Sequence, residues 1–169
     1  MGIIKLHNKY FKSYITNDII EQSVQNMVNQ VAEDCKDEIP LFIGILNGSF
    51  MFVADFVRKY NFNCEVSFVK LASYQGTSST GNIKQLVGVN EDLEGRTVVI
   101  LEDIIDTGNT LEEIYKIFKD KKVKTLKIAT LFFKPDVFNK ELPIDYIGIS
   151  IPDKFIVGYG LDYNGIGRN

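Results

Sequence analysis

The sequence predicts an α/β fold with a mostly parallel central sheet flanked by helices. Two observations support this prediction: short, nearly continuous apolar runs follow one another along the chain, and segments with helical periodicity lie between several of them. Continuous apolar runs are typical of strands covered on both faces, and alternating strands and helices are typical of a parallel sheet. A length of 169 residues suits one well-packed domain and is too short for two large ones. We therefore expect a single domain over residues 1–169.

The first predicted element is an amphipathic helix. Its apolar residues recur at intervals of three and four, which is the spacing of one helical face: Ile15, Ile19, Ile20, Val24, Met27, Val28 and Val31. Thr16 or Asn17 is a suitable N-cap, because a side-chain oxygen at that position can accept a hydrogen bond from a free backbone amide of the first turn. We expect the apolar stripe of this helix to pack against the core.

Five apolar runs then predict strands, and two further segments predict helices. The strands are Leu41–Leu46, Val66–Leu71, Thr97–Leu101, Leu126–Phe133 and Ile144–Ile149. The helices are Phe50–Tyr60 and Thr110–Lys119. In sheets of this kind, ligands bind beyond the carboxyl ends of the strands, where loops lead into helices. The candidate functional residues should therefore follow the predicted strands.

Composition excludes several classes of partner. The chain has 22 acidic and 19 basic side chains and a formal net charge of −3, so it lacks the basic field that a nucleic-acid partner requires. No apolar run reaches the roughly 18 to 20 residues that a bilayer requires, so we expect no membrane partner. The N-terminal segment is too polar for a signal peptide, and we expect a cytoplasmic protein.

Cysteine and histidine contribute little to the predicted chemistry. Cys35 and Cys64 lie in unrelated contexts without the spacing of metal ligands, and we expect buried thiols. His7 is the only histidine, which excludes a histidine-rich metal site and argues against Ser-His or Cys-His nucleophile schemes. Any chemistry must then use carboxylates, lysines, backbone amides or a bound metal.

Three carboxylates gather where the central predicted strand ends. Glu102 and Asp103 follow the strand directly, and Asp106 comes three residues later. Carboxylates placed together repel one another and raise one another's pKa, unless a metal, a polyhydroxyl ligand or a proton offsets their charge. This segment therefore indicates a site for a sugar or a metal.

The next four residues, Thr107 to Thr110, indicate an anion site. Gly108 allows a sharp backbone turn, and the amides at the start of the following helix point toward any bound anion. The hydroxyl groups of Thr107 and Thr110 add further donors. Acidic side chains beside an anion cradle fit a phosphorylated sugar.

Two other interpretations of this segment remain open. Asp106 or Thr107 could simply cap the helix, with Glu102 and Asp103 as solvated loop acids. The run Ile-Ile-Asp-Thr-Gly at residues 104–108 also matches the aspartic protease signature, but that fold is all-β and the chain holds one such run rather than two. The glycine motifs of kinases and dehydrogenases are absent from the sequence.

At residues 98–111 the sequence resembles the phosphoribosyl pyrophosphate loop of the type I phosphoribosyltransferases. Four further segments resemble the hypoxanthine (hypoxanthine-guanine) branch of that family: Gly44–Phe52, Ser73-Tyr74 with Ser79–Gly81, Lys134–Asp136, and Pro152–Asn164. The resemblance implies the fold of that family, with a small hood and a mobile lid loop. It also implies an enzyme that uses Mg²⁺ and joins phosphoribosyl pyrophosphate to a 6-oxopurine base, and that assembles as a homodimer or homotetramer.

The same resemblance assigns roles to residues. Glu102 and Asp103 would hold the ribose hydroxyls directly or through magnesium, and Asp162 matches a second metal-linked acid. The 5′-phosphate would lie against Asp106, Thr107, Gly108, Asn109 and Thr110. Asp106 also matches the proposed general base, which accepts a proton from the imidazole ring of the purine.

The remaining roles concern the purine and the pyrophosphate. Lys134 would donate to the 6-oxo group, Phe155 would stack on the ring, and Ile156 and the neighbourhood of Asp162 would read the far edge of the purine. Asn47, Gly48 and Arg168 match the pyrophosphate site, although Asn47 replaces the Lys or Arg of many relatives. Ser73 and Tyr74 would belong to the lid. A phosphoribosyl pyrophosphate sensor of the same fold is an alternative, but its basic nucleic-acid-binding surface is not evident in this acidic chain.

Overall fold

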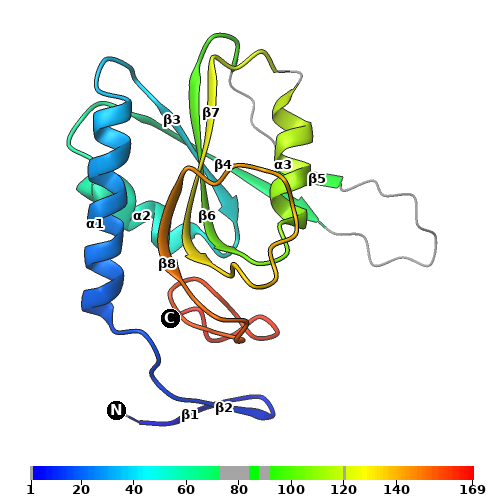
Figure 1. The fold of residues 1–169 in the computed structure, drawn as a ribbon. Helices are drawn as coiled ribbons and strands as arrows, with labels where there is room; N and C mark the ends of the chain where they lie inside the picture. The colour runs from blue at the N-terminus through cyan, green and yellow to red at the C-terminus, as the bar shows by residue number, and fades with distance from the viewer. Residues whose placement is uncertain (1, 73–83, 88–91, 120) are drawn as a thin grey trace.

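A six-stranded sheet forms the centre of the protein (Figure 1). The computed structural model describes residues 2–72, 84–87, 92–119 and 121–169. The strand order is β5-β4-β3-β6-β7-β8, and each pair is parallel except β4 with β5. The strands are β3 (Leu41–Leu46), β4 (Glu65–Ala72), β5 (Lys84–Val87), β6 (Thr97–Ile105), β7 (Thr125–Phe133) and β8 (Tyr146–Ser150). The predicted mostly parallel sheet is confirmed.

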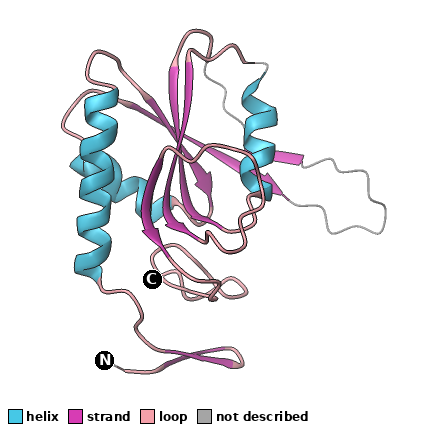
Figure 2. Ribbon diagram, viewed as in Figure 1, coloured by secondary structure: helices cyan, strands magenta, loops and turns pink. Residues whose placement is uncertain are grey.

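Helices cover both faces of this sheet (Figure 2). The helices are α1 (Asn17–Asp34), α2 (Phe50–Lys59) and α3 (Asn109–Lys119). One buried cluster joins α1 and α2 to one face of the sheet, and a second joins α3 to the other face. Successive residues of β3 alternate between the clusters, with Phe42 in the first and Leu41 and Ile43 in the second. Because neighbouring side chains both find apolar cover, the strand is a continuous apolar run.

The first helix follows the predicted pattern with one exception. Thr16 occupies the N-cap position with an extended backbone, and Ile20, Val24, Met27, Val28 and Val31 are buried. Ile19, which the predicted apolar stripe includes, is 50% exposed. The helix begins at Asn17. Its buried stripe passes through Ile20, the residue directly after Ile19.

The largest difference from prediction is at β6. The apolar run suggested that this strand ends at Leu101, but its pairing with β7 continues through Glu102↔Thr130 to Ile105↔Phe133. Glu102 and Asp103 therefore lie inside a buried strand and not in a solvated loop. Backbone hydrogen bonding between neighbouring strands keeps the two acids in the sheet despite their charge.

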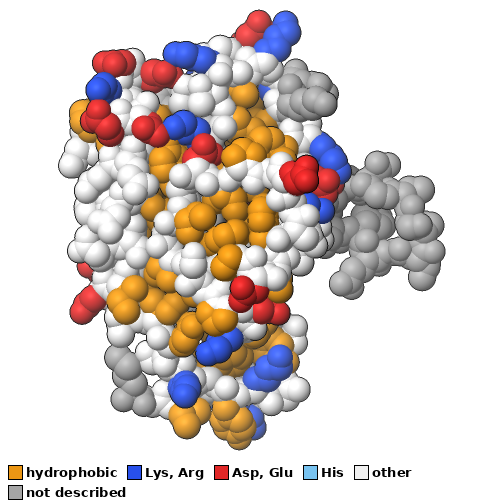
Figure 3. Space-filling model, in the orientation of Figure 1, with side chains coloured by type: hydrophobic (Ala, Val, Ile, Leu, Met, Phe, Trp, Pro, Cys, Tyr) orange, Lys and Arg blue, Asp and Glu red, His pale blue; other side chains and the backbone are white. Residues whose placement is uncertain are grey.

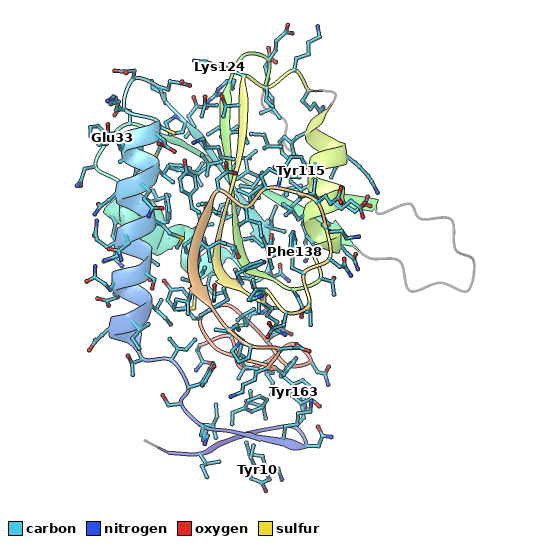
Figure 4. The ribbon with its side chains drawn as sticks, viewed as in Figure 1. Tyr10, Glu33, Tyr115, Lys124, Phe138 and Tyr163 are labelled. Atoms are coloured by element: carbon cyan, nitrogen blue, oxygen red, sulfur yellow. The ribbon has the colours of Figure 1, made fainter. Side chains whose placement is uncertain are left out.

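Short segments at the two ends of the described chain lie together below the sheet. The antiparallel hairpin of β1 (Ile4–Leu6) and β2 (Lys9–Phe11) packs against the segment that follows β8, and in Figure 4 Tyr163 of this segment lies above the hairpin that carries Tyr10. The Tyr163 hydroxyl donates to Asn8 Oδ1 at 2.6 Å. These contacts place a small unit at the carboxyl edge of the sheet, where the sequence predicts a hood. The predicted lid residues Ser73 and Tyr74 lie outside the described residues.

Two other expectations are decided by the fold. Because the Asp-Thr-Gly segment joins a parallel strand to a helix, the aspartic protease interpretation is wrong. Cys35 is buried as predicted, and Cys64 is half-buried. Among the residues described, no helix is long and apolar enough to cross a membrane.

Close packing of α2 on β3 depends on Gly44. A Cβ atom at this position would lie 2.7 Å from Val53 Cγ2 and 2.9 Å from two ring atoms of Phe68. We predict that Gly44→Ala lowers the free energy of unfolding by about 1–3 kcal/mol, because overpacking forces the helix or the ring to shift. Urea unfolding measures this as a lower midpoint with an unchanged slope. Gly2→Ala, where a Cβ meets open space, is the control, and equal midpoints for both variants would contradict the packing described.

Candidate active site

The candidate site lies at the carboxyl edge of the sheet, where β6, β7 and β8 end beside one another. The register pairs Ile105 with Phe133 and Phe133 with Ser150. The residues that follow these strands are therefore held in a row. The loop after β3 reaches the same edge, because β3 is parallel to β6.

Three adjoining cavities occupy this edge. The first, of about 310 Å³, is lined by Asn47, Gly48, Asp103, Ile104, Asp106, Lys134, Lys154, Phe155, Ile156, Leu161, Asp162 and Arg168. The second, of about 260 Å³, includes Glu102 and all of residues 104–111 in its lining. The third, of about 270 Å³, includes Gly48, Glu102, Asp103, Asn109 and Thr110. Every predicted site residue that the structure describes lines at least one of these cavities.

The second cavity is formed by the turn between β6 and α3. Gly108 has φ of +87°, and a Cβ atom there would lie 2.6 Å from the Phe138 ring. Glycine is required by both the conformation and the space. Thr107, Asn109 and Thr110 are exposed around the turn, and α3 begins at Asn109 with its free amides beside the cavity. The arrangement can bind a phosphate without any basic side chain.

Glu102 and Asp103 form a buried pair of carboxyl groups between the three cavities. Burial raises the pKa of Glu102 well above its ordinary value, and the adjacent Asp103 charge raises it further. Burial also raises the pKa of Asp103, although a hydrogen bond from Glu102 opposes that rise. The charged form of Glu102 is therefore disfavoured in this site. Among the described residues, Glu102 Oε2 has no hydrogen-bond partner, so the pair has an unused oxygen for a ligand.

The loop after β3 approaches this pair closely. The Leu46–Asn47 peptide bond is cis. A Cβ atom at Gly48 would overlap with the Asp103 carboxylate, and one at Gly160 would overlap with the Gly48 carbonyl oxygen. Only glycine fits at these two contacts, because the backbone of the loop lies directly between the acids and the C-terminal segment.

Arg168 and Asp162 close the first cavity from the C-terminal segment. Arg168 Nη2 lies 2.6 Å from Asp162 Oδ1, and its other terminal nitrogen donates to the Gly160 carbonyl. Asp162 Oδ2 accepts a hydrogen bond of 2.6 Å from the Gly165 amide. Among the described residues, no group of three or more His, Cys, Asp or Glu side chains could hold a metal ion by itself. The predicted ligands Glu102, Asp103 and Asp162 therefore do not form one ready-made cage.

Lys134 lies at the end of β7 between two acids. Its Nζ donates to Asp106 Oδ2 and to Asp153 Oδ1, each at 2.9 Å. Burial alone would lower the pKa of Lys134, but the hydrogen bonds to Asp153 and Asp106 outweigh it and raise that pKa above its ordinary value. The side chain is 7% exposed and remains a charged donor at the floor of the first cavity.

Phe155 forms an aromatic wall of the same cavity and is 55% exposed. Its ring centroid lies 6.2 Å from that of Phe11 and 5.5 Å from that of Tyr163. Lys9 Nζ lies 4.9 Å from the centroids of both Phe155 and Tyr163. The N-terminal hairpin thus supports the ring that the resemblance assigns to purine stacking. The sequence did not predict this support.

Two further residues of the site were also missed. Asp153 and Lys154 lie in the Pro152–Asn164 segment, but no role was assigned to either. Lys154 lines the first cavity, and Asp153 contacts Lys134. The position of Asp153 just beyond the predicted strand Ile144–Ile149 is the signal that could have identified it, since strand ends meet at this edge.

Known proteins resemble the chain in both sequence and structure. Residues 12–164 match the family of phosphoribosyl transferase domains. A hypoxanthine-guanine phosphoribosyltransferase of Streptococcus pyogenes is 43% identical over 151 residues, which cover 89% of this chain and 83% of that protein. One of Staphylococcus epidermidis is 39% identical over 154 residues, covering 88% and 86%. The crystal structure of a Bacillus anthracis hypoxanthine-guanine phosphoribosyltransferase superposes with a TM-score of 0.88 at 35% identity, covering 94% of each chain.

The chain therefore belongs to the phosphoribosyltransferase family, and within that family to the hypoxanthine-guanine phosphoribosyltransferases. The resemblance seen in the sequence is confirmed, and so is the corresponding fold.

The raised pKa of Glu102 predicts a specific dependence of stability on pH. In the unfolded chain a glutamate loses its proton at about pH 4.3. Above that pH the folded protein binds more protons at Glu102 than the unfolded chain does, so its stability falls as pH rises toward the folded pKa. Because Gln stays neutral, we predict that Glu102→Gln has the higher Tm at pH 8 and that the difference shrinks toward pH 4. Melting curves in a chelating buffer measure this effect. Parallel Tm profiles for the two proteins would contradict it.

Proposed function

We propose that this protein transfers the 5-phosphoribosyl group of phosphoribosyl pyrophosphate to hypoxanthine and guanine in purine salvage. The products are the purine nucleoside 5′-monophosphate and pyrophosphate. The observation that most directly supports this function is that three cavities meet at Glu102 and Asp103. An anion cradle lies on one side of these acids, and Lys134 and Phe155 lie on another. The names of the relatives support the same reaction.

The reaction requires stabilisation of charge at C1 of the ribose. As pyrophosphate leaves, the C1–oxygen bond breaks, and C1 gains positive character before a purine ring nitrogen bonds to it. The helix amides around Gly108 fix the 5′-phosphate, while Glu102 and Asp103 bind the ribose hydroxyls. Their carboxyl oxygens can accept hydrogen bonds from the two hydroxyls. This positions C1 opposite the base cavity.

We propose Mg²⁺ as the cofactor. The fit rests on the buried acid pair, which has one unpartnered oxygen and a raised pKa that a cation would relieve. Glu102 and Asp103 would hold the ion together with ligand oxygens, and Asp162 would contribute through the pyrophosphate side of the cavity. When bound, the ion neutralises charge on the departing pyrophosphate.

The pyrophosphate would bind at the cis loop and at Arg168. Asn47, Gly48 and Arg168 all line the first cavity. Asn47 supplies no cation, so we assign the charged contact with pyrophosphate to Arg168. Ser73 and Tyr74, proposed as the lid over pyrophosphate, lie outside the described residues.

The purine is recognised by complementary donors and acceptors. An ammonium has three N–H donors, of which Lys134 uses two for Asp106 and Asp153. The third would donate to the 6-oxo group of the base. The exposed Phe155 ring offers a stacking surface, and the Ile156 backbone with the neighbourhood of Asp162 reads the edge that carries the C2 substituent.

We also propose that the chain forms a symmetric homodimer or homotetramer. Phe50 follows the cis loop at the start of α2 and is 45% exposed. Ile147 of the edge strand β8 is 41% exposed, and Figure 3 shows hydrophobic side chains gathered on the face where β8 lies. These apolar groups are suited to contact with another subunit.

A single assay tests the proposed reaction. Purified protein is given phosphoribosyl pyrophosphate and Mg²⁺ with hypoxanthine, guanine, xanthine or adenine in turn, and nucleotide formation is followed by absorbance. We expect turnover with hypoxanthine and guanine and none with adenine, whose 6-amino group presents a donor to the Lys134 donor. Binding of phosphoribosyl pyrophosphate without turnover of any base would instead indicate a regulatory protein of the same fold.

Asp106 is proposed as the general base that accepts the imidazole proton of the purine. Asp106 lines both the first cavity, proposed for the base, and the second cavity, proposed for the phosphate. Its side chain is 48% exposed. We predict that Asp106→Asn lowers kcat about 10²- to 10⁴-fold, the usual contribution of general-base catalysis, while nucleotide product still binds. Steady-state kinetics and product titration measure the two effects. Unchanged kcat in the folded variant would rule out proton transfer to Asp106.

A further inference from the structure

We propose that Asp153 is a positioning residue that holds the Lys134 ammonium in place for the purine base. This inference rests on the proposed function, because the base is the ligand that Lys134 would contact. It adds to the site an acid that does not itself need to touch substrate.

The backbone fixes Asp153 beside Lys134. β7 and β8 are parallel and end in register at Phe133 and Ser150. The Ile151 amide then donates to the Phe133 carbonyl at 2.8 Å, which continues the pairing beyond the strand. The Lys154 amide donates to the Pro152 carbonyl at 2.6 Å and turns the chain at Asp153. The carboxylate is thereby directed back to the end of β7.

The resulting contact joins a buried cation to two acids from neighbouring strands. Lys134 donates to Asp106 after β6 and to Asp153 after β8, each at 2.9 Å. Its side chain is 7% exposed, whereas those of Asp106 and Asp153 are 48% and 59% exposed. A cation removed from water needs charged partners, and removal of one partner leaves it poorly compensated.

Asp153 matters most when Asp106 is occupied. If Asp106 accepts the proton of the purine, its carboxylate becomes neutral and no longer balances the ammonium. Asp153 is then the remaining anion in contact with Lys134. It also fixes the direction of the third N–H, because two of the three tetrahedral donors are already held. Without Asp153, the ammonium would turn toward Asp106 and away from the base.

An exposed carboxylate in an ion pair can also have no more than a structural role. Such surface pairs usually contribute little to stability, and this one could be expendable. Glu65 provides a matched case, since its carboxylate pairs with Arg96 at 2.8 Å and its side chain is 53% exposed. Glu65 starts β4 at the opposite edge of the sheet, away from the three cavities.

The test compares Asp153→Asn, which keeps the shape and removes the charge, with Glu65→Gln and wild type. For Asp153→Asn we expect kcat/KM for hypoxanthine to fall about 10- to 100-fold, the range for a lost hydrogen bond to a charged group. The loss should appear as a higher KM for the base, with the KM for phosphoribosyl pyrophosphate unchanged. The Tm should also fall, because the buried ammonium keeps only one anionic partner. Glu65→Gln should match wild type in all four quantities. Equal kinetics for Asp153→Asn and wild type would overturn the proposal.

Two further variants separate positioning from folding. Asp153→Glu keeps the charge on a longer side chain and should restore most of the lost kcat/KM, whereas a loss equal to that of Asp153→Asn would contradict a charge role. In a Lys134→Met background, Asp153→Asn should cause no further loss, because the two residues act through one contact. Additive losses would overturn the proposal. If the wild-type protein itself fails to use hypoxanthine, the proposed function is wrong. Failure of this inference is a separate result, seen in the variants of an active wild-type protein.

Discussion

The proposed active site depends on two adjacent carboxyl groups held inside a buried strand. Glu102 and Asp103 are part of β6, which pairs with β7 at Glu102 and again at Ile104 and Ile105, so the sheet prevents them from moving into water. Their burial disfavours the charged form of Glu102, and among the described residues one of its oxygens has no hydrogen-bond partner. Glycine at positions 48 and 160 lets the cis loop and the C-terminal segment approach these acids. The three cavities are arranged around this pair.

The ends of the neighbouring strands fix the positions of the other charged residues in the site. Three neighbouring parallel strands deliver Asp106, Lys134 and Asp153 to one row, with the cation between the two acids. The anion cradle lies on the other side of Glu102, and among the described residues its lining contains no basic side chain. Under the proposed function, backbone amides of the second cavity would bind the phosphate and Lys134 would bind the base in the first cavity. This division would allow the site to hold two different substrates side by side.

Much of this arrangement follows from local sequence pattern, and the exceptions have physical causes. The run Leu41–Leu46 is bounded as predicted, because both of its faces are covered and its pattern has no polar interruption. The sequence places Glu102 and Asp103 at the end of the strand, where the apolar run stops, and only the pairing with β7 shows that the strand continues to Ile105. The hairpin of β1 and β2 is too short and too polar to predict. Asp153 gained meaning only from its contact with Lys134, which joins residues 19 positions apart.

The hairpin has a consequence for the order in which the molecule is assembled during synthesis. His7 contacts the Asn164 carbonyl, Asn8 accepts from Tyr163, and Leu6 packs at Gly167. The ribosome makes the hairpin side of each contact more than 150 residues before the other side. The hairpin must therefore wait, without its partner surface, while the whole sheet emerges and folds. The ring of Phe155 gains its support from Phe11 last, so a nascent chain acquires its sheet before it acquires a competent binding site for the base.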